Sequence, residues 1–157
     1  MSAVIPLEKY SIRTFNEGDL DQVLAIENNI YGFPWTRKIF RDCVQIGYSC
    51  YLVEYENQIL AYGVMSMGAG EAHLLNLSVS KLNQGKGIGG YLLDAFIAHA
   101  IVNTINTIFL EVRPSNSAAI NLYENKGFNQ VGQRRDYYPT KNGREDAFIY
   151  ALDISGL

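Results

Sequence analysis

A run of glycines near the middle of the chain constrains the fold more than any other feature of the sequence. Residues 73–79 have the composition of a buried strand, and the segment Gln84-Gly85-Lys86-Gly87-Ile88-Gly89 follows it. Beyond the glycines, an apolar stripe with helical spacing contains Ile88, Leu92, Ala95 and Phe96. Glycine lets backbone N–H groups approach an anion closely, and the first turn of a helix carries a partial positive charge. A strand, a glycine loop and a helix in this order predict a pyrophosphate-binding loop.

Two common interpretations of such glycines do not fit this chain. Gly85, Gly87 and Gly90 satisfy the pattern G-x-G-x-x-G, which is typical of dinucleotide sites. In dinucleotide-binding folds that pattern occupies the first strand-to-helix turn, whereas about half of this chain precedes it. A nucleoside-triphosphate P-loop is excluded because no Gly-Lys-Ser/Thr follows. On these residues alone, a flexible glycine turn that binds nothing remains open.

The rest of the chain predicts one domain of mixed strands and helices. Its 157 residues are close to the common size of a single domain, and 48% of them are hydrophobic, which is enough for one core. Alternating or continuous apolar runs predict strands at residues 10–15, 50–55, 59–67, 73–79, 107–112, 128–137 and 146–153. We therefore expect a single domain that covers residues 1–157.

Local signals predict where the helices and turns of this domain lie. The predicted helix N-caps are Asn16 or Asp19, Thr36, and Ser115 or Asn116. The predicted glycines at helix ends are Gly47 and Gly127. The predicted turns between paired strands are Glu56-Asn57 and Lys141-Asn142-Gly143.

Composition excludes several classes of function. A formal charge of −3 does not favour nucleic-acid binding, which needs clustered Lys and Arg, although a basic polypeptide is a possible partner. Cys43 and Cys50 form no CxxC pair and have no His cluster nearby, so we expect neither a metal site nor a disulfide framework. We expect a cytoplasmic protein without membrane contact, because the chain has no leader and no apolar run of about 18 to 20 residues.

The segment from Gln84 to Gly89 resembles the Q/R-x-x-G-x-G/A signature of the GNAT acetyltransferases. The resemblance implies that this loop holds the pyrophosphate of acetyl-CoA, and that no metal takes part. It also implies that the β-strand segment Leu77-Ser78-Val79 pairs through its backbone with the pantetheine arm. The implied fold is α/β, with a central mixed, mostly antiparallel sheet of about seven strands, about four helices, and one parallel pair of strands that splays apart.

A narrower resemblance covers nearly the whole chain. The segments that carry it are Phe33–Trp35, Leu110–Arg113, Asn116, Leu122–Phe128, Arg134–Thr140 and Gly143–Ala147. They are similar to bacterial ribosomal-protein-alanine N-acetyltransferases of the RimI type. The acceptor that this implies is the N-terminal alanine of a basic small-subunit ribosomal protein, whose amine attacks acetyl-CoA directly in a ternary complex. Two alternatives remain: acetylation of a small-molecule amine or a lysine, and a catalytically silent regulatory domain that binds CoA.

Acetyl transfer to an amine needs a proton acceptor for the amine and a proton donor for the departing thiolate. Glu111, at the end of a predicted buried strand, is the candidate base; the alternative is a carboxylate paired with Arg113 or solvent. Tyr123 is the candidate acid, and Asn116 lies two helical turns before it, so both are expected on one side. Asn116 then holds the pantetheine or the start of the helix. Tyr123 alternatively serves only in packing.

Three further residues are weaker candidates for binding the acceptor. Glu27 shares the apolar stripe of the first helix, which suggests substrate recognition; the alternative is a charge at the fraying helix end. Trp35 and Tyr138 are candidates for the walls of a peptide slot, to which Tyr31 and Tyr137 also belong as possibilities. The pair Arg134-Arg135 is compatible with a CoA phosphate or with an acidic surface.

Overall fold

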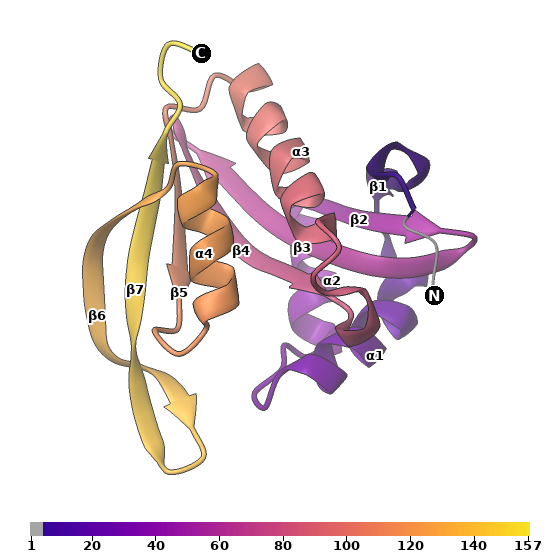
Figure 1. Cartoon of the computed structure of the whole chain (residues 1–157), viewed down its shortest axis with the longest axis horizontal. Coiled ribbons are helices and arrows are strands. Elements are labelled where there is room, and N and C mark those ends of the chain that lie inside the picture. Colours follow the sequence, from indigo (N-terminus) through magenta and orange to yellow (C-terminus); the bar gives the residue numbers. More distant parts are fainter. Residues whose placement is uncertain (1–4) are drawn as a thin grey trace. The chain divides into compact units, whose positions relative to one another are not determined.

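The computed structural model describes residues 5–157 and shows an α/β arrangement (Figure 1). Its α-helices are α1 (Leu20–Ile30), α2 (Arg37–Ile46), α3 (Ile88–Val102) and α4 (Ser117–Asn125). Its strands are β1 (Ser11–Thr14), β2 (Ser49–Tyr55), β3 (Gln58–Gly68), β4 (Glu71–Val79), β5 (Thr107–Val112), β6 (Asn129–Thr140) and β7 (Gly143–Asp153). Every strand and helix expected from the sequence is present, and β5 has the expected bounds.

The strands form a sheet in the order β1-β2-β3-β4-β5-β7-β6. β4 and β5 are parallel, whereas the pairs β1–β2, β5–β7 and β6–β7 are antiparallel. The last strand of the chain, β7, thus lies between β5 and β6. The prediction of a mixed, mostly antiparallel sheet with one parallel pair is confirmed.

The chain forms two compact units, which are described separately below. The first unit contains the described residues 5–64 and 76–95, and the second contains Met65–Leu75 and Phe96–Leu157. Strands β3 and β4 and helix α3 contribute residues to both. Among residues 5–157 there is no helix with the length and apolar character required to span a bilayer.

In the first unit, α1 and α2 close a hydrophobic core over β1 to β3 (Figure 1). Helix α2 begins at the expected cap, where Thr36 Oγ1 accepts a hydrogen bond from Ile39 N at 3.4 Å. It ends at Gly47, whose φ of 91° is a left-handed conformation that glycine adopts without strain. The buried core residues are Phe15, Leu20, Val23, Phe40, Cys43, Cys50, Leu52, Ile59, Tyr62 and Val64.

Both residues that the sequence offers as alternative N-caps of α1, Asn16 and Asp19, form hydrogen bonds at the start of this helix. The Asn16 side chain accepts a hydrogen bond from Gly18 N at 2.9 Å, and Asp19 Oδ2 accepts one from Asn16 N at 3.0 Å. This capping box encloses a short 3₁₀ turn, Glu17–Asp19, which the sequence did not indicate. Helix α1 therefore starts only at Leu20.

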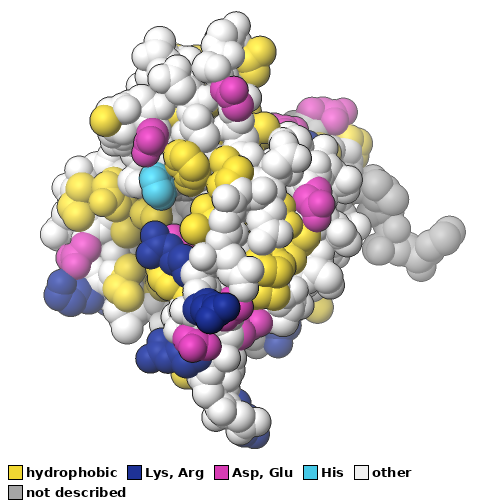
Figure 2. All heavy atoms as spheres, turned by 90° about the vertical axis from the view of Figure 1, so that its left-hand side faces the viewer, with side chains coloured by type: hydrophobic (Ala, Val, Ile, Leu, Met, Phe, Trp, Pro, Cys, Tyr) yellow, Lys and Arg dark blue, Asp and Glu magenta, His cyan; other side chains and the backbone are white. Residues whose placement is uncertain are grey.

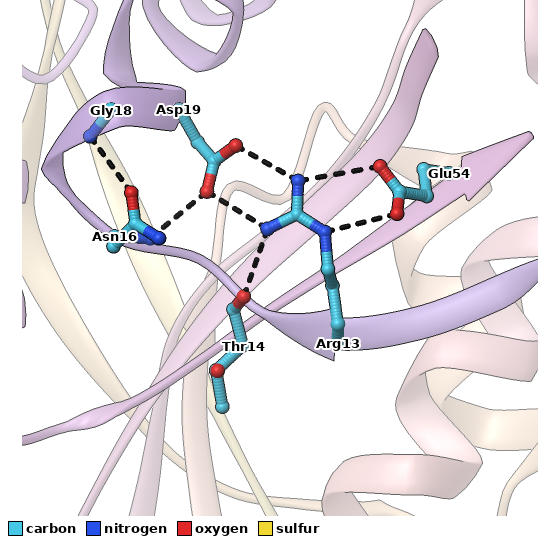
Figure 3. Close-up of polar contacts among 6 residues, drawn as sticks. All are labelled: Arg13, Thr14, Asn16, Gly18, Asp19 and Glu54. Carbon is cyan, nitrogen blue, oxygen red and sulfur yellow. Dashed lines mark hydrogen bonds and ion pairs between the residues drawn. The ribbon is translucent and has the colours of Figure 1, made fainter. Parts of the chain in front are cut away.

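Asp19 also anchors a charge cluster around Arg13 (Figure 3). The Arg13 guanidinium donates to both oxygens of Asp19 at 2.9 Å and to both oxygens of Glu54, at 3.0 and 3.3 Å. Such two-point contacts are the stronger form of ion pair. The hydrogen bond from Arg13 lowers the pKa of Asp19 below its usual range. The cluster therefore links β1, β2 and the start of α1.

We expect Asp19→Asn to lower the free energy of unfolding at pH 7 by about 1 kcal/mol, because Arg13 loses a charged acceptor but stays partly solvated. A carboxyl group with a lowered pKa stabilises the fold above its ordinary pKa of about 3.9 and loses that contribution as the pH falls through the folded value. Urea unfolding from pH 7 to pH 3 should therefore show the difference shrinking.

Asp21→Asn is the matched control for this charge cluster. Asp21 also lies at the start of α1 and pairs with an arginine, Arg37, but its side chain is 87% exposed. We expect it to cost less than about 0.5 kcal/mol. An equal loss in both variants would show that Asp19 acts only as a negative charge near the helix start.

In the second unit, β5 is flanked by β7, and α4 covers part of this sheet (Figure 1). Ile108, Leu110 and Val112 of β5 are buried, so its alternate residues, including Glu111, belong to the opposite face. Gly127, which follows α4, has a φ of 97°, and a Cβ there would stand 3.3 Å from Leu152 Cδ1 of β7. Glycine thus allows both the helix end and its close approach to β7.

The hairpin of β6 and β7 is longer than the sequence predicts. The expected strands stop at residue 137 and resume at residue 146, whereas the observed pairing continues to Thr140 and Gly143. The hairpin carries Arg134, Arg135 and Arg144 as well as Asp136, Glu145 and Asp146. Figure 2 shows basic and acidic side chains close together just above the narrow lower end of that view. Charge on the hairpin is therefore mixed in sign.

Candidate functional site

The glycine loop lies in the first unit, at the start of α3. A 3₁₀ turn, Lys81–Asn83, which the sequence does not predict, separates it from β4. Gly85 and Gly87 have φ values of 78° and 82°, which residues with a Cβ rarely adopt. Tyr91 N donates to Gly87 O at 3.0 Å, which is a first helical hydrogen bond of α3. The loop thus places exposed backbone at the positive end of a 15-residue helix, a setting suited to an anion.

β4 leads to this loop and extends beyond its pairing with β5. Its parallel pairing with β5 runs from Glu71–Thr107 to Leu74–Leu110, and β4 then continues to Val79. Gln84 Nε2 donates to Val79 O at 3.0 Å, so the first loop residue is fixed to the end of the strand. The Ser78 side chain points into the interior, whereas Leu77 and Val79 alternate to the other face.

Glu27 is the most deeply buried carboxylate in the described part of the chain, at 2% exposure. Its Oε1 accepts hydrogen bonds from Tyr62 Oη at 2.7 Å and Asn76 Nδ2 at 3.1 Å, and its Oε2 accepts one from Trp35 N at 2.9 Å. The alternative of a charge at a fraying helix end is therefore wrong. Glu27 instead joins α1, β3, β4 and the loop before α2.

A second chain of hydrogen bonds extends from this carboxylate to the loop after α1. Ser78 Oγ donates to Asn76 Oδ1, and Tyr31 Oη is bonded to Ser78 Oγ, each at 2.6 Å. Burial raises the pKa of Tyr31, so this hydroxyl stays protonated. Trp35 packs its ring on Phe40, with centroids 5.2 Å apart. Both ends of the loop 31–36 are thus fixed to the interior of the first unit.

Glu111 lies in the second unit among cationic and aromatic side chains. Arg134 Nε of β6 is 3.4 Å from Glu111 Oε1, whereas Arg113 pairs with Glu145, Nη1 to Oε1, at 3.0 Å. The expected alternative partner of Glu111, Arg113, is therefore engaged elsewhere. The Glu111 side chain is 26% exposed, so solvent reaches the carboxylate.

Two tyrosines of β6 complete the surroundings of Glu111. Burial raises the pKa of Tyr138 to about 12, with the charge of Glu111 adding to the effect. Burial also raises the pKa of Tyr137, which donates a hydrogen bond to Glu111. The rings meet edge to face, with centroids 5.0 Å apart. Both hydroxyl groups thus stay protonated at neutral pH, and that of Tyr137 contacts the carboxylate.

Tyr123 and Asn116 belong to α4 in the same unit. Asn116 is the N-cap, because its Oδ1 accepts a hydrogen bond from Ala119 N at 3.2 Å. Of the two caps that the sequence allowed, this is the one used. Tyr123 is 7% exposed, and its ring meets Phe128 edge to face at 5.7 Å between centroids. The structure thus places Tyr123 within a packed helix face.

Sequence reasoning missed several members of these networks. Tyr62 and Asn76 were not singled out, although a polar residue at an inward position of a strand, such as Asn76, was a usable signal. The sequence indicates Tyr137 only as a possible wall of the peptide slot, and it allows two kinds of partner for Arg134. Their roles depend on strand register, which a single sequence does not specify.

The chain can now be compared with known proteins. A model of the acetyltransferase (GNAT) family matches residues 20–128. The [ribosomal protein bS18]-alanine N-acetyltransferase of Escherichia coli K12 is 38% identical over 145 residues, which are 92% of this chain and 98% of that protein. The chain belongs to the GNAT acetyltransferase family. This GNAT acetyltransferase is thus an enzyme by family, and the resemblance seen in its glycine loop is confirmed.

Solved structures agree with the family assignment. The crystal structure of the ribosomal-protein-S18-alanine N-acetyltransferase from E. coli matches with a TM-score of 0.88 and 37% identity, covering 94% of this chain and 96% of that one. Arabidopsis thaliana Naa50, in complex with the bisubstrate analogue CoA-Ac-MVNAL, matches with a TM-score of 0.81 and 20% identity, covering 93% and 99%. The second match shows that this GNAT acetyltransferase shares the fold of that protein.

Proposed function

We propose that the protein transfers the acetyl group of acetyl-CoA to the N-terminal alanine of a ribosomal protein of the bS18 type. The observation that carries this proposal is the extent of the similarity, which covers 98% of the bS18-alanine N-acetyltransferase of E. coli at 38% identity. The family match over residues 20–128 includes both the glycine loop and Glu111, and the similarity over 145 residues is longer than that match. The similarity thus reaches the segments around Glu111 in addition to the anion loop.

Acetyl-CoA is assigned to the glycine loop and the end of β4. Backbone N–H groups from Gln84 to Gly89 bind the pyrophosphate, supported by the helix start and by the charge of Lys86. The backbone of Leu77 to Val79, which continues beyond the pairing with β5, binds the pantetheine arm. Asn116 caps α4, and we assign it the same arm. The bound acetyl-CoA supplies the acyl group, and no metal is needed.

Glu111 and Tyr123 are assigned to proton transfer. Glu111 takes a proton from the substrate ammonium, directly or through water, since its carboxylate is reached by solvent, and the neutral amine attacks the thioester carbonyl. Tyr123 donates its hydroxyl proton to the departing CoA thiolate. In the second unit, we assign Tyr138 to contact with the acceptor. In the first unit, we assign Trp35 to the same task, and Glu27 supports it by holding the backbone N of Trp35.

The chemistry of the amine favours an N-terminus over a lysine. A terminal amine has a reference pKa of about 7.7 to 8.0 and a lysine about 10.4, so near pH 7.5 the terminal amine is neutral hundreds of times more often. A carboxylate in contact with water is a modest base, and a modest base is sufficient for such an amine.

The test is acetylation of a short basic peptide that begins with Ala and contains one internal lysine. Tandem mass spectrometry locates the added acetyl group, and thiol release gives the rate. Two comparison acceptors are the same peptide with a blocked N-terminus and a free polyamine. We expect acetylation at the α-amine, with both other acceptors at least about tenfold slower.

Different results would favour different functions. Faster acetylation of the blocked peptide or of the polyamine would replace the N-terminal assignment with a lysine or small-amine acetyltransferase. Binding of CoA without turnover of any acceptor would indicate a regulatory domain.

A further inference from the structure

We propose that Asp146 is a positioning residue whose carboxylate holds a bulge in β6, and that this bulge turns Tyr137 and Tyr138 together toward Glu111 to form the wall of the acceptor site. The inference rests on the proposed function, because it names what shapes the peptide side of that site. It concerns only the second unit, where β5, β6 and β7 lie side by side (Figure 1).

The bulge is defined by the register of β6 and β7. Arg134 pairs with Ala147 and Tyr138 pairs with Glu145, so residues 135–137 of β6 lie opposite Asp146 alone. Asp136, in the middle of the bulge, has a φ of 49°, which is in the left-handed region. Such a conformation is unfavourable for a residue with a Cβ and persists only where neighbours hold it. The bulge therefore needs a restraint.

Asp146 supplies that restraint from the opposite strand. Its Oδ1 accepts a hydrogen bond from the backbone N of Asp136 at 3.0 Å, and its Oδ2 accepts a short one from Gln133 Nε2. These hydrogen bonds lower the pKa of Asp146, so the carboxylate is charged at neutral pH. One side chain thus satisfies the backbone donor of the strained residue and fixes the strand just before the bulge.

The consequence is that consecutive tyrosines reach the same side of the sheet. In a regular strand, residues 137 and 138 would point to opposite faces. Here Tyr137 bonds to Glu111, and the ring of Tyr138 lies 4.4 Å from the guanidinium carbon of Arg113. Tyr138 pairs with Glu145 and Glu111 pairs with Ile149, and these two partners are four residues apart on β7, so Tyr138 and Glu111 share a face of the sheet. The bulge is what allows both tyrosines to border the carboxylate.

The two tyrosine rings are suited to contact the N-terminal end of a peptide whose first residue has a small apolar side chain. Tyr137 is 43% exposed and Tyr138 is partly buried, so their edge-to-face pair presents apolar surface beside the carboxylate. Tyrosine offers a rigid apolar ring with a polar tip, which suits recognition of a methyl group next to an amine. Loss of the bulge would move one ring away and weaken acceptor binding, leaving the glycine loop untouched.

The test compares Asp146→Ala with Asp146→Asn in the full chain. Alanine removes the cap, and we expect the KM for the Ala-peptide to rise about tenfold or more while the KM for acetyl-CoA stays unchanged. Asparagine can still accept from Asp136 N through its carbonyl oxygen, and can donate to Gln133 after that amide flips, so we expect it to stay within about threefold of the parent. Equal losses in both variants would overturn the proposal, because a charge would then matter and a cap would not.

Backbone amide exchange gives a readout that does not depend on activity. The Asp136 amide should be protected in the parent protein and in Asp146→Asn, and should lose protection in Asp146→Ala, with thermal unfolding confirming that each variant is folded. Unchanged protection in Asp146→Ala would overturn the proposal. If the parent acetylates no Ala-peptide, the proposed function fails, whereas the exchange result still decides whether Asp146 holds the bulge.

A second substitution separates the bulge from any other effect of Asp146. Glycine adopts positive φ values without a steric penalty, so Asp136→Gly should favour the bulge in the absence of its cap. We expect Asp136→Gly combined with Asp146→Ala to recover most of the peptide KM lost in Asp146→Ala. No recovery would show that Asp146 acts otherwise than through the conformation of residue 136.

Discussion

Glu111→Gln is expected to lower kcat/KM for a peptide that begins with Ala by about a hundredfold at pH 7. The amide keeps the shape of the side chain but cannot take the proton of the substrate ammonium. The loss lies near the low end of what general bases contribute, because an α-amine with a pKa of about 8 is partly neutral already. Initial rates of the parent and of Glu111→Gln from pH 6.5 to 9 measure this loss. The difference in kcat/KM should narrow as the pH rises, because the amine then deprotonates without a base.

Arg134→Gln is the matched control for this substitution. It breaks the same ion pair, since Arg134 Nε lies 3.4 Å from Glu111, but leaves the carboxylate in place. If Glu111 is the base, Arg134→Gln should retain activity within about tenfold, because a partly exposed ion pair contributes little by itself. Equal loss in both variants, or a defect in Glu111→Gln that is the same at all pH values, would assign Glu111 a structural role.

Tyr123→Phe is expected to lower kcat about a hundredfold with little change in either KM. The hydroxyl is assigned to protonation of the CoA thiolate, which occurs only as the thiol leaves and therefore does not affect ground-state binding. The effect is limited because a thiol with a reference pKa of about 8.5 is a fair leaving group even as the anion. Steady-state kinetics with both substrates varied would measure it.

Tyr150→Phe controls for the loss of a hydroxyl from a buried ring in the same unit. Tyr150 lies on β7 and is 5% exposed, close to the 7% of Tyr123. We expect this variant to keep its turnover. A rise in the peptide KM of Tyr123→Phe with kcat preserved would contradict the role of an acid and place Tyr123 in acceptor binding.

The sequence predicted the elements of the fold because their signals are local. Thr36 and Gly47 bound α2 as expected, and the turn Glu56-Asn57 joins β2 and β3 with φ values of 50° and 66°. The glycine loop was recognisable for the same reason, since left-handed backbone at Gly85 and Gly87 is a property of those residues. Such features need no knowledge of distant parts of the chain.

The sequence could not predict which side chains meet across the sheet. The contact of Arg134 with Glu111 could not be predicted because it depends on the register of β6. That strand contains two register shifts. The bulge at Asp136 carries no glycine to mark it. Glu27 was recognised as facing inward, yet its three donors come from segments up to 49 residues away. Long-range pairing of this kind is decided by packing.

The convergence of donors on Glu27 also bears on how this family can change over time. Tyr62, Asn76 and the backbone of Trp35 all direct a hydrogen bond at one carboxylate in the interior of the first unit. An apolar residue at position 27 would leave all three donors without an acceptor, and each would then carry the cost of a buried polar group. Positions 27, 62 and 76 should therefore be exchanged in concert among relatives, so that divergence at this point proceeds by rare joint replacement.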